Sequence, residues 1–376
     1  MYTAPALRIP SPRLTAVSML CLLPACLAQF PPQPAPSFKV HTPPVTLLVT
    51  VRDRHGALAG HFAAADLTLT QDGRAQKIES FTQDSTLPFR LGLLIDTSRV
   101  MSRAMGAERK AAEKFVDAML PPNPATGNDQ AFLIHFDREV ELLRDFTSSR
   151  QKLHSELDQL GPTSNESQED PQAQETSSGG REWNRSPQLY DAIFLASDEL
   201  MTNKDGRKAL IVFSDGVDQG SRESLNDAID AADRANVEIY TIHFKGGPES
   251  GASSFPGHGG HRGGMGGAWP GSGWPGGYPG GGHPAGGSRA SGVDGKKILE
   301  TIARRTGGRA FEARKAENLD AIYTQIAQEL RGQYMLTFTP DQVDNNGSYH
   351  KLALETDRHG YKAVTREGYY ASTKNR

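Results

Sequence analysis

Cysteine is nearly absent from this chain of 376 residues, which contains only Cys21 and Cys26. Both lie close to the N-terminus, so the rest of the chain has no disulfide, no cysteine nucleophile and no thiolate-bound zinc. An excess of either charge is also absent, because 41 Lys and Arg residues are balanced by 44 Asp and Glu residues and the formal net charge is −3. We therefore expect no electrostatic recruitment of nucleic acid or of an anionic membrane.

The motifs of nucleotide-binding proteins and of common hydrolases are missing too. No G-x-G-x-x-G follows the first buried strand, and no G-x-x-x-x-G-K-[ST] occurs. Ser214, Asp215 and His243 have the residue types of a catalytic triad, but the serine lacks the flanking glycines of a G-x-S-x-G elbow. The sequence therefore predicts a protein that is not an enzyme, with a hydrolase as an alternative.

The N-terminus has the features of an export signal. Arg8 and Arg13 form a basic region, and the apolar run 14–27 is too short for a comfortable transmembrane helix. Cleavage after Ala28 would make residues 1–28 a signal peptide, whereas lipidation at Cys26 or an uncleaved anchor are the alternatives. No later segment is apolar over a sufficient length to span a membrane. We therefore expect a secreted or cell-envelope protein, in the periplasm or outside the cell.

Two kinds of strand pattern occupy the rest of the chain. Near both ends, alternating apolar residues and turn signals predict antiparallel strands at 45–51, 67–70, 75–81, 334–339, 351–355 and 362–365. Between them, apolar runs predict buried strands at 91–95, 131–136, 209–213 and 237–244, with a further strand at the sheet edge at 140–146. Helical spacing is present at 102–120, 150–160, 189–201, 221–235, 296–306 and 319–331.

The alternation of buried strands with helices predicts an α/β fold with a doubly wound, Rossmann-like sheet. The strands near either chain end are too few to bury a sheet face alone, so we expect them to pair into one small antiparallel β-domain. The expected segments are a signal peptide 1–28, a Pro-rich linker 29–43, β-domain halves 44–86 and 333–371, and the α/β domain 87–332. Two insertions poor in aliphatic residues interrupt the α/β domain, the polar stretch 162–186 and the Gly-rich, disordered stretch 246–292.

Polar side chains follow two of the buried strands directly. Asp96 and Ser98 come after the run 91–95, and Asp215 comes after the run 209–213. Because ligands bind outside the carboxyl ends of the strands in an open α/β sheet, we expect these side chains at one edge. Their carboxylate and hydroxyl oxygens suit Mg²⁺. A purely structural interpretation makes Asp96 and Asp215 caps of helix N-termini and Ser98 a hydrogen bonder within its loop.

The motifs LGLLIDTS, FSDG after a buried strand and LYDAI at a helix start together resemble a von Willebrand factor A-type (VWA) domain. The flanking KIESF, at 77–81, and GYY, at 368–370, are similar to the bacterial VWFA-related family of acidobacterial type. The resemblance runs from about residue 45 to residue 371, apart from the two insertions. It implies a Rossmann-like domain that binds other proteins.

The resemblance also implies a metal-ion-dependent adhesion site, with D-x-S-x-S on one loop, Thr on a second and Asp on a third. Asp96, Ser98 and Asp215 match this pattern, but Val100 replaces the second serine and Pro187 replaces the threonine. Neither replacement can coordinate a cation, so the site is partly degenerate and weak binding of Mg²⁺ or Mn²⁺ is the cofactor expectation. Two nearby serines are candidate substitutes for the lost ligands, Ser102 and Ser186.

The leading hypothesis is an exported binding protein whose VWA domain recognises a protein or peptide at the carboxyl edge of its sheet. The resemblance implies that a partner carboxylate completes the coordination of the ion. Since two ligand positions are lost, recognition without a metal is the alternative. A structural role in cell-envelope assembly is a second hypothesis, and a cation-dependent partner would separate the two.

Overall fold

Three β-sheets organise the structure, a computed structural model that describes residues 43–83, 86–123, 128–161, 187–245, 294–341 and 347–371. All of these residues belong to one compact unit, Thr42–Arg376. The expected signal peptide 1–28, almost all of the linker 29–43 and both insertions, 162–186 and 246–292, lie outside the described residues.

The largest sheet has six strands in the order β10-β9-β8-β5-β6-β7. Neighbouring strands are parallel except for β7, which runs antiparallel to β6 at the sheet edge. Nearly every residue of β5, β8 and β9 is buried, as the continuous apolar runs predict. The strands are β5 (Phe89–Asp96), β6 (Gln130–Phe136), β7 (Val140–Thr147), β8 (Arg207–Ser214), β9 (Val237–Phe244) and β10 (Ala310–Ala313).

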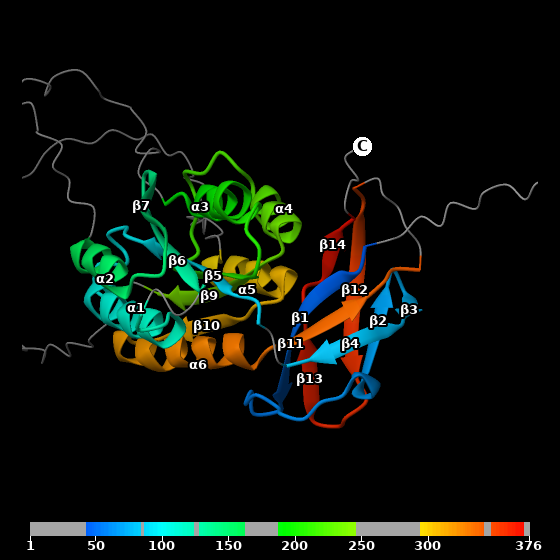
Figure 1. Ribbon diagram of the computed structural model, residues 1–376. Helices are drawn as coiled ribbons and strands as arrows, with labels where there is room; N and C mark the ends of the chain where they lie inside the picture. The colour runs from blue at the N-terminus through cyan, green and yellow to red at the C-terminus, as the bar shows by residue number, and fades with distance from the viewer. Residues whose placement is uncertain are drawn as a thin grey trace, which may run out of the picture. The chain divides into compact units, whose positions relative to one another are not determined.

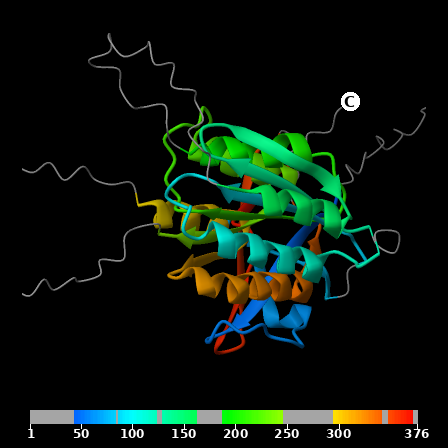
Figure 2. The ribbon, with the colours of Figure 1, turned by 90° about the vertical axis from the view of Figure 1, so that its left-hand side faces the viewer.

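Helices cover both faces of this sheet (Figures 1 and 2), which confirms the doubly wound α/β fold. One face packs against α1 (Met105–Met119), α2 (Arg150–Gln159) and α6 (Leu319–Gly332). The other packs against α3 (Leu189–Leu195), its π-helical continuation η2 (Ala196–Met201), α4 (Leu225–Ala235) and α5 (Gly295–Thr306). A short 3-10 turn, η3 (Ala316–Asn318), precedes α6.

Two helix starts lie later than the sequence predicts. Helix α4 begins at Leu225 rather than at residue 221, because the Ser224 hydroxyl accepts a hydrogen bond from Asp227 N and the Asp227 carboxylate in turn accepts one from Ser224 N. Helix α1 begins at Met105, after residues that form turns instead of the helix expected from residue 102. The four-residue strand β10 was not predicted, since so short a segment has no distinctive periodicity.

The strands from the two chain ends form two four-stranded antiparallel sheets, in the orders β13-β1-β11-β4 and β14-β12-β2-β3. Strand β1 from the N-terminal end lies between β11 and β13 from the C-terminal end, and β2 pairs with β12. Alternate residues of these strands make a shared apolar core. The strands are β1 (Val45–Asp53), β2 (Leu67–Gln71), β3 (Arg74–Gln76), β4 (Ile78–Thr82), β11 (Tyr334–Phe338), β12 (Tyr349–Thr356), β13 (Tyr361–Val364) and β14 (Gly368–Tyr370), with a 3-10 turn η1 (Ala64–Asp66). The expected pairing of the chain ends is confirmed.

Ion pairs join this β-domain to the α/β part, and the carboxylate at the centre of one of them is buried. Glu329 of α6, whose side chain is 1% exposed, accepts a 2.6 Å hydrogen bond from Arg52 of β1 and a second bond from Arg309. Arg304 of α5 pairs with Glu367, next to β14. These contacts connect residues far apart in sequence, so the two parts stabilise one another. Within the described ranges, no helix combines the length and the apolar character needed to cross a bilayer.

Candidate functional site

Asp96 is the last residue of β5 and is completely buried. Its Oδ1 accepts a 2.9 Å hydrogen bond from Ser98 N, and its Oδ2 accepts a 2.8 Å hydrogen bond from Ser214 Oγ. Burial raises the pKa of Asp96 to about 6, and the negative charge of Asp215 adds to this rise, whereas contacts with the two serines oppose it. The carboxylate is therefore held between the loops that follow β5 and β8.

Asp215 comes directly after β8 and is partly exposed. Its Oδ1 accepts a 2.9 Å hydrogen bond from Val217 N. Burial raises the pKa of Asp215, although this hydrogen bond and the nearby His243 oppose the rise. Strands β5 and β8 pair in parallel with Ile95 opposite Phe213, so the fold brings Asp96 and Asp215 to the same edge of the sheet.

The Ser98 hydroxyl is buried and makes no hydrogen bond of normal geometry. The hydroxyl lies close enough to Asp96 to lower the pKa of that carboxyl. A buried hydroxyl that makes no hydrogen bond of normal geometry costs about 1–3 kcal/mol, so a ligand that reached it would gain from bonding to it. Val100, two residues further along the same loop, is 43% exposed, one of the most exposed large apolar side chains among the described residues. The loop after β5 thus presents a buried hydroxyl and an apolar surface side by side in sequence.

Pro187, at the position where the resemblance implies a threonine, lies against the loop that follows Asp215. Its carbonyl accepts a 3.4 Å hydrogen bond from Gln219 N, and the next residue, Gln188, donates from its backbone to Asp137 O at 3.0 Å. Of the two candidate substitutes, Ser186 lies outside the described residues. Ser102 is exposed, and its hydroxyl donates a 2.8 Å hydrogen bond to Arg99 O.

The side-chain oxygens at this edge are of the type that a hard cation prefers, but they are too few to complete its coordination. Asp96, Ser98 and Asp215 would hold such an ion through carboxylate and hydroxyl oxygens, the ligands that Mg²⁺ prefers. Val100 and Pro187 offer no side-chain oxygen. In the part of the chain that the structure describes, no three His, Cys, Asp or Glu side chains form a group that could hold a metal ion. Water or a partner would have to supply the remaining ligands.

The alternative interpretation of the two aspartates as helix caps is wrong. The N-cap of α1 is Ala104, eight positions after Asp96, and the N-cap of α4 is Ser224, nine positions after Asp215. Both aspartates instead accept hydrogen bonds from the backbone two residues ahead, within their own loops. The two carboxylates therefore shape loops and leave the helix ends to other residues.

Further residues brace this edge without a signal in the sequence. Asp218 Oδ1 accepts hydrogen bonds from Tyr190 N at 3.1 Å and from Ser221 Oγ at 2.6 Å, which ties the loop after β8 to the start of α3. Asp191, the aspartate of LYDAI, adds a second connection between the same segments, because its carboxylate accepts hydrogen bonds from the backbone N–H of Arg222 at 3.0 Å. These pairings come from loops about 30 residues apart, and periodicity does not report them.

Gly216, the glycine of the FSDG motif, is also held in place at this edge of the sheet. Its φ is +78°, and a Cβ atom there would lie 2.2 Å from the carbonyl oxygen of Gly295, at the start of α5. Glycine is therefore required both by the backbone conformation and by the close contact. The loop that carries Asp215 is thus packed tightly against α5.

Ser214 is not placed as a nucleophile. It is fully buried, its hydroxyl donates to Asp96 and it accepts a 3.0 Å hydrogen bond from Gly216 N. His243 is its partner across β8 and β9, yet the buried Nδ1 of this histidine has no hydrogen-bond partner. The contacts therefore do not join serine and histidine into the pair that a hydrolase needs.

Three solved structures illustrate what the chain resembles. An aerotolerance-related membrane protein from Bacteroides fragilis NCTC 9343 is 15% identical, with a TM-score of 0.40 over 64% of this chain and 98% of that one. The von Willebrand factor domain of the type V pili tip protein Mfa5 from Porphyromonas gingivalis is 14% identical, with a TM-score of 0.41 over 65% and 95%. Proximal thread matrix protein 1 from the mussel byssus, with a zinc-occupied MIDAS motif, is 13% identical, with a TM-score of 0.43 over 69% and 49%.

Comparison of the sequence with protein families is more direct than comparison of structures. No curated protein matches the chain. The family model described as the von Willebrand factor type A domain matches residues 91–217, which run from β5 through β8 to the loop of Asp215. Those residues include the candidate site, most of β5, and strands β6, β7 and β8. This segment therefore carries the sequence pattern of a VWA domain.

Proposed function

We propose that this chain is an exported binding protein, not an enzyme, that recognises a protein or peptide at the carboxyl edge of its six-stranded sheet. The match of residues 91–217 to the VWA domain supports a binding role, because domains of this type are typically non-catalytic. The bacterial VWFA-related family remains the finer assignment that we favour, on the strength of the flanking motifs at 77–81 and 368–370.

The observation that carries the proposal is the combination at the loop after β5. The buried Ser98 hydroxyl makes no hydrogen bond of normal geometry, and Val100, two positions further along the same loop, is 43% exposed. An unsatisfied polar group next to an exposed apolar side chain is the arrangement that a ligand with one hydrogen-bonding group and an apolar contact would complete. A partner segment that docks on this loop would meet both.

A divalent cation has a secondary role in this proposal. Mg²⁺ or Mn²⁺ held by Asp96, Ser98 and Asp215 would act as a Lewis acid that binds a partner carboxylate. Because two ligand positions are Val100 and Pro187, we expect weak binding of the ion and recognition that depends little on it. The partner then contacts the protein side chains themselves.

Site-specific crosslinking tests this function. A photoreactive amino acid is placed at position 100, or, as the control, at Leu58, an exposed apolar residue outside the α/β sheet. Envelope extract from the native host should give a specific crosslinked product from position 100 only. The product should disappear with Asp96→Asn combined with Ser98→Ala, and EDTA should leave most of it. Equal labelling from both positions would contradict the proposed site.

Export is tested separately. We propose the secreted or envelope location on the basic and apolar N-terminal segments, with cleavage after Ala28. Mass spectrometry of the protein from its native host should identify Gln29 as the first residue. A lipidated Cys26 would establish the lipoprotein alternative, and an intact Met1 would overturn cleavage.

A further inference from the structure

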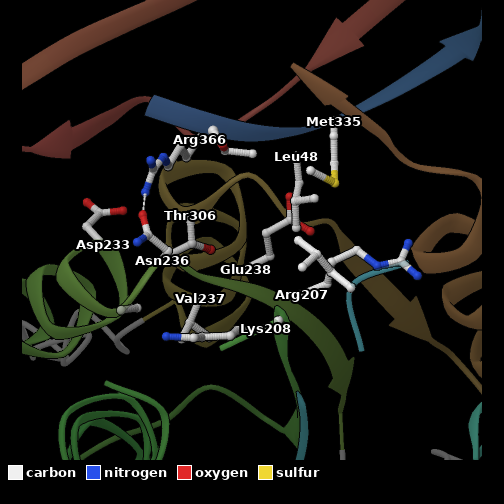
Figure 3. Close-up of a pocket in the computed structure, with 14 residues that line it drawn as sticks. Leu48, Arg207, Lys208, Asp233, Asn236, Val237, Glu238, Thr306, Met335 and Arg366 are labelled. Atoms are coloured by element: carbon white, nitrogen blue, oxygen red, sulfur yellow. Dashed lines mark hydrogen bonds between the residues drawn. The ribbon is translucent and has the colours of Figure 1, made fainter. Parts of the chain in front are cut away.

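A cleft of about 200 Å³ lies between the edge of the six-stranded sheet and the β-domain, away from the carboxyl edge (Figure 3). The first residues of β8 and β9 and the C-terminal end of α4 form one wall, and residues of β1 and β11 form the other. Its volume exceeds that of an engineered protein cavity of about 150 Å³ that binds benzene. The cleft is therefore large enough for a small organic molecule.

One end of the cleft holds a buried guanidinium group with an unused donor. Arg366 is 9% exposed, and its Nη1 donates a hydrogen bond to Asn236 Oδ1. Its Nε is buried and has no hydrogen-bond partner. Burial lowers the pKa of Arg366, although Asp233 and Glu238 favour its charged form. A ligand oxygen placed at this end would satisfy the free donor.

The same end holds a buried carboxylate with two unused acceptors. Asp233 of α4 is 2% exposed, and neither of its carboxylate oxygens accepts a hydrogen bond. Arg305 Nη2 lies 3.8 Å from Oδ2, which is a long ion pair. Burial raises the pKa of Asp233 to about 7 in spite of the attraction of Arg366 and Arg305. A ligand with N–H donors would satisfy this carboxylate.

The other charged groups of the cleft have partners, although the buried Nε of Arg207, like that of Arg366, has no hydrogen-bond partner in the structure. Lys208 donates to Ala235 O at 3.0 Å, and the guanidinium of Arg207 stacks on the ring of Phe89 at 3.8 Å. Glu238 accepts a hydrogen bond from Gln333. Arg366 and Asp233 are the two oppositely charged groups with unpartnered atoms that share one end of the cleft.

Apolar side chains line part of the opposite end of the cleft, beside Arg207 and Glu238. Leu48 of β1 and Met335 of β11 lie there in Figure 3, away from the three side chains Asp233, Asn236 and Arg366. Leu87 also lines the cleft and is 42% exposed. A ligand that fits both ends has a carboxylate next to an ammonium group, and a short apolar side chain beyond them.

We propose that this cleft binds a free α-amino acid with an aliphatic side chain. Its carboxylate accepts from Arg366 Nε, its ammonium donates to the two oxygens of Asp233, and its side chain contacts Leu48 and Met335. This ligand satisfies the unpartnered polar atoms on both charged side chains at once, which neither a simple anion nor a simple cation does. The site is independent of the partner site at the carboxyl edge.

Isothermal titration calorimetry on the full mature chain tests the proposal, with L-leucine, glycine, acetate and methylamine as separate probes. L-Leucine should bind more tightly than glycine by about tenfold, because it also buries an apolar side chain. Acetate and methylamine should bind at least tenfold more weakly than glycine. The absence of heat and of any thermal stabilisation with both amino acids at 10 mM, roughly the weak limit for small ligands, would mean that water alone occupies the cleft and would overturn the proposal. Acetate binding as tightly as glycine would also overturn it.

Substitutions identify the groups responsible. Asp233→Asn and Arg366→Gln should each weaken L-leucine binding at least tenfold, whereas Glu300→Gln, an exposed carboxylate on α5 that does not line the cleft, should not. Met335→Trp fills the apolar end without touching either charged group, and it should weaken L-leucine while sparing glycine. Met335→Trp also keeps the proposal testable if the substitutions at Asp233 and Arg366 prevent folding. Unchanged L-leucine affinity in Met335→Trp together with Asp233→Asn would refute the proposed site.

Discussion

The hydroxyl of Ser214, at the end of β8, donates a 2.8 Å hydrogen bond to Oδ2 of Asp96, at the end of β5. The two residues are 118 positions apart in the chain, and both are fully buried. This bond joins the two loops that carry the candidate site. It also favours the ionised form of a carboxylate that burial disfavours, so the geometry of the site depends on a residue outside the expected metal pattern.

Removal of the Ser214 hydroxyl is expected to destabilise the protein by about 1–3 kcal/mol, because Ser214→Ala leaves Oδ2 of Asp96 and the backbone N–H of Gly216 without a partner. Urea unfolding measures the loss. The control is Ser102→Ala, whose exposed hydroxyl bonds only within its own loop, and it should stay within about 0.5 kcal/mol of the parent. Equal effects of the two substitutions would show that the bond between β8 and β5 contributes little.

Repair of the metal pattern should create a site that the native chain largely lacks. We expect native Mg²⁺ binding no tighter than about 10⁻³ M, at the weak end of oxygen-ligand sites. The double substitution Val100→Ser and Pro187→Thr should tighten binding at least tenfold, because it restores two hydroxyl ligands. Calorimetric titration with Mg²⁺ and Mn²⁺ measures both.

Adding Asp215→Ala to the repaired chain should abolish the gain. Tight binding by the native chain that Asp96→Ala removes would show that other oxygens complete the site. If the repaired chain gains nothing, Pro187 is not at the position of the second-loop ligand.

A buried carboxyl group should make stability depend on pH. Glu108 of α1 is completely buried and accepts a hydrogen bond from Tyr323, and burial raises its pKa to about 8, above the ordinary value of 4.5. The folded state therefore holds this proton more tightly than the unfolded state does. The stabilisation is complete below about pH 4.5 and is lost as the pH rises through 8.

Glu108→Gln should remove this contribution, since glutamine stays neutral and can still accept from Tyr323. Relative to the parent, the variant should gain stability on going from pH 5 to pH 8 in urea unfolding experiments. Glu300→Gln, an exposed carboxylate on α5, is the control and should show no such gain. The same pH dependence in Glu108→Gln and in the parent would assign the titration to other groups.

Truncation after Thr339 should disrupt strands at the opposite end of the chain. The deletion removes β12 and β13, which pair with β2 and β1 respectively. Amides of β1 and β2 should then lose protection from hydrogen exchange, while those of β5 in the middle of the six-stranded sheet keep theirs. Undiminished protection in β2 would show that the N-terminal strands fold without the C-terminal ones.

The sequence by itself determined the fold class and the place of the candidate site. Continuous apolar runs marked β5 and β8 as strands buried on both faces, and the polar residues after them, Asp96 and Asp215, had to lie at one edge of a parallel sheet. Alternation near the two ends marked strands that need partners, which indicated a shared β-domain. Both inferences rest on local periodicity, which burial imposes on neighbouring residues.

Only the tertiary structure decided which side chains meet. The bond from Ser214 to Asp96 and the cleft that contains Asp233 and Arg366 both bring together elements distant in sequence. The periodicity of apolar residues indicates that a residue is buried, but it does not indicate which residues pack against it. Arg366 comes after a strand whose sequence looks exposed, so the sequence does not indicate that Arg366 is buried. Its burial beside the end of α4 results from the packing of the β-domain on the α/β sheet.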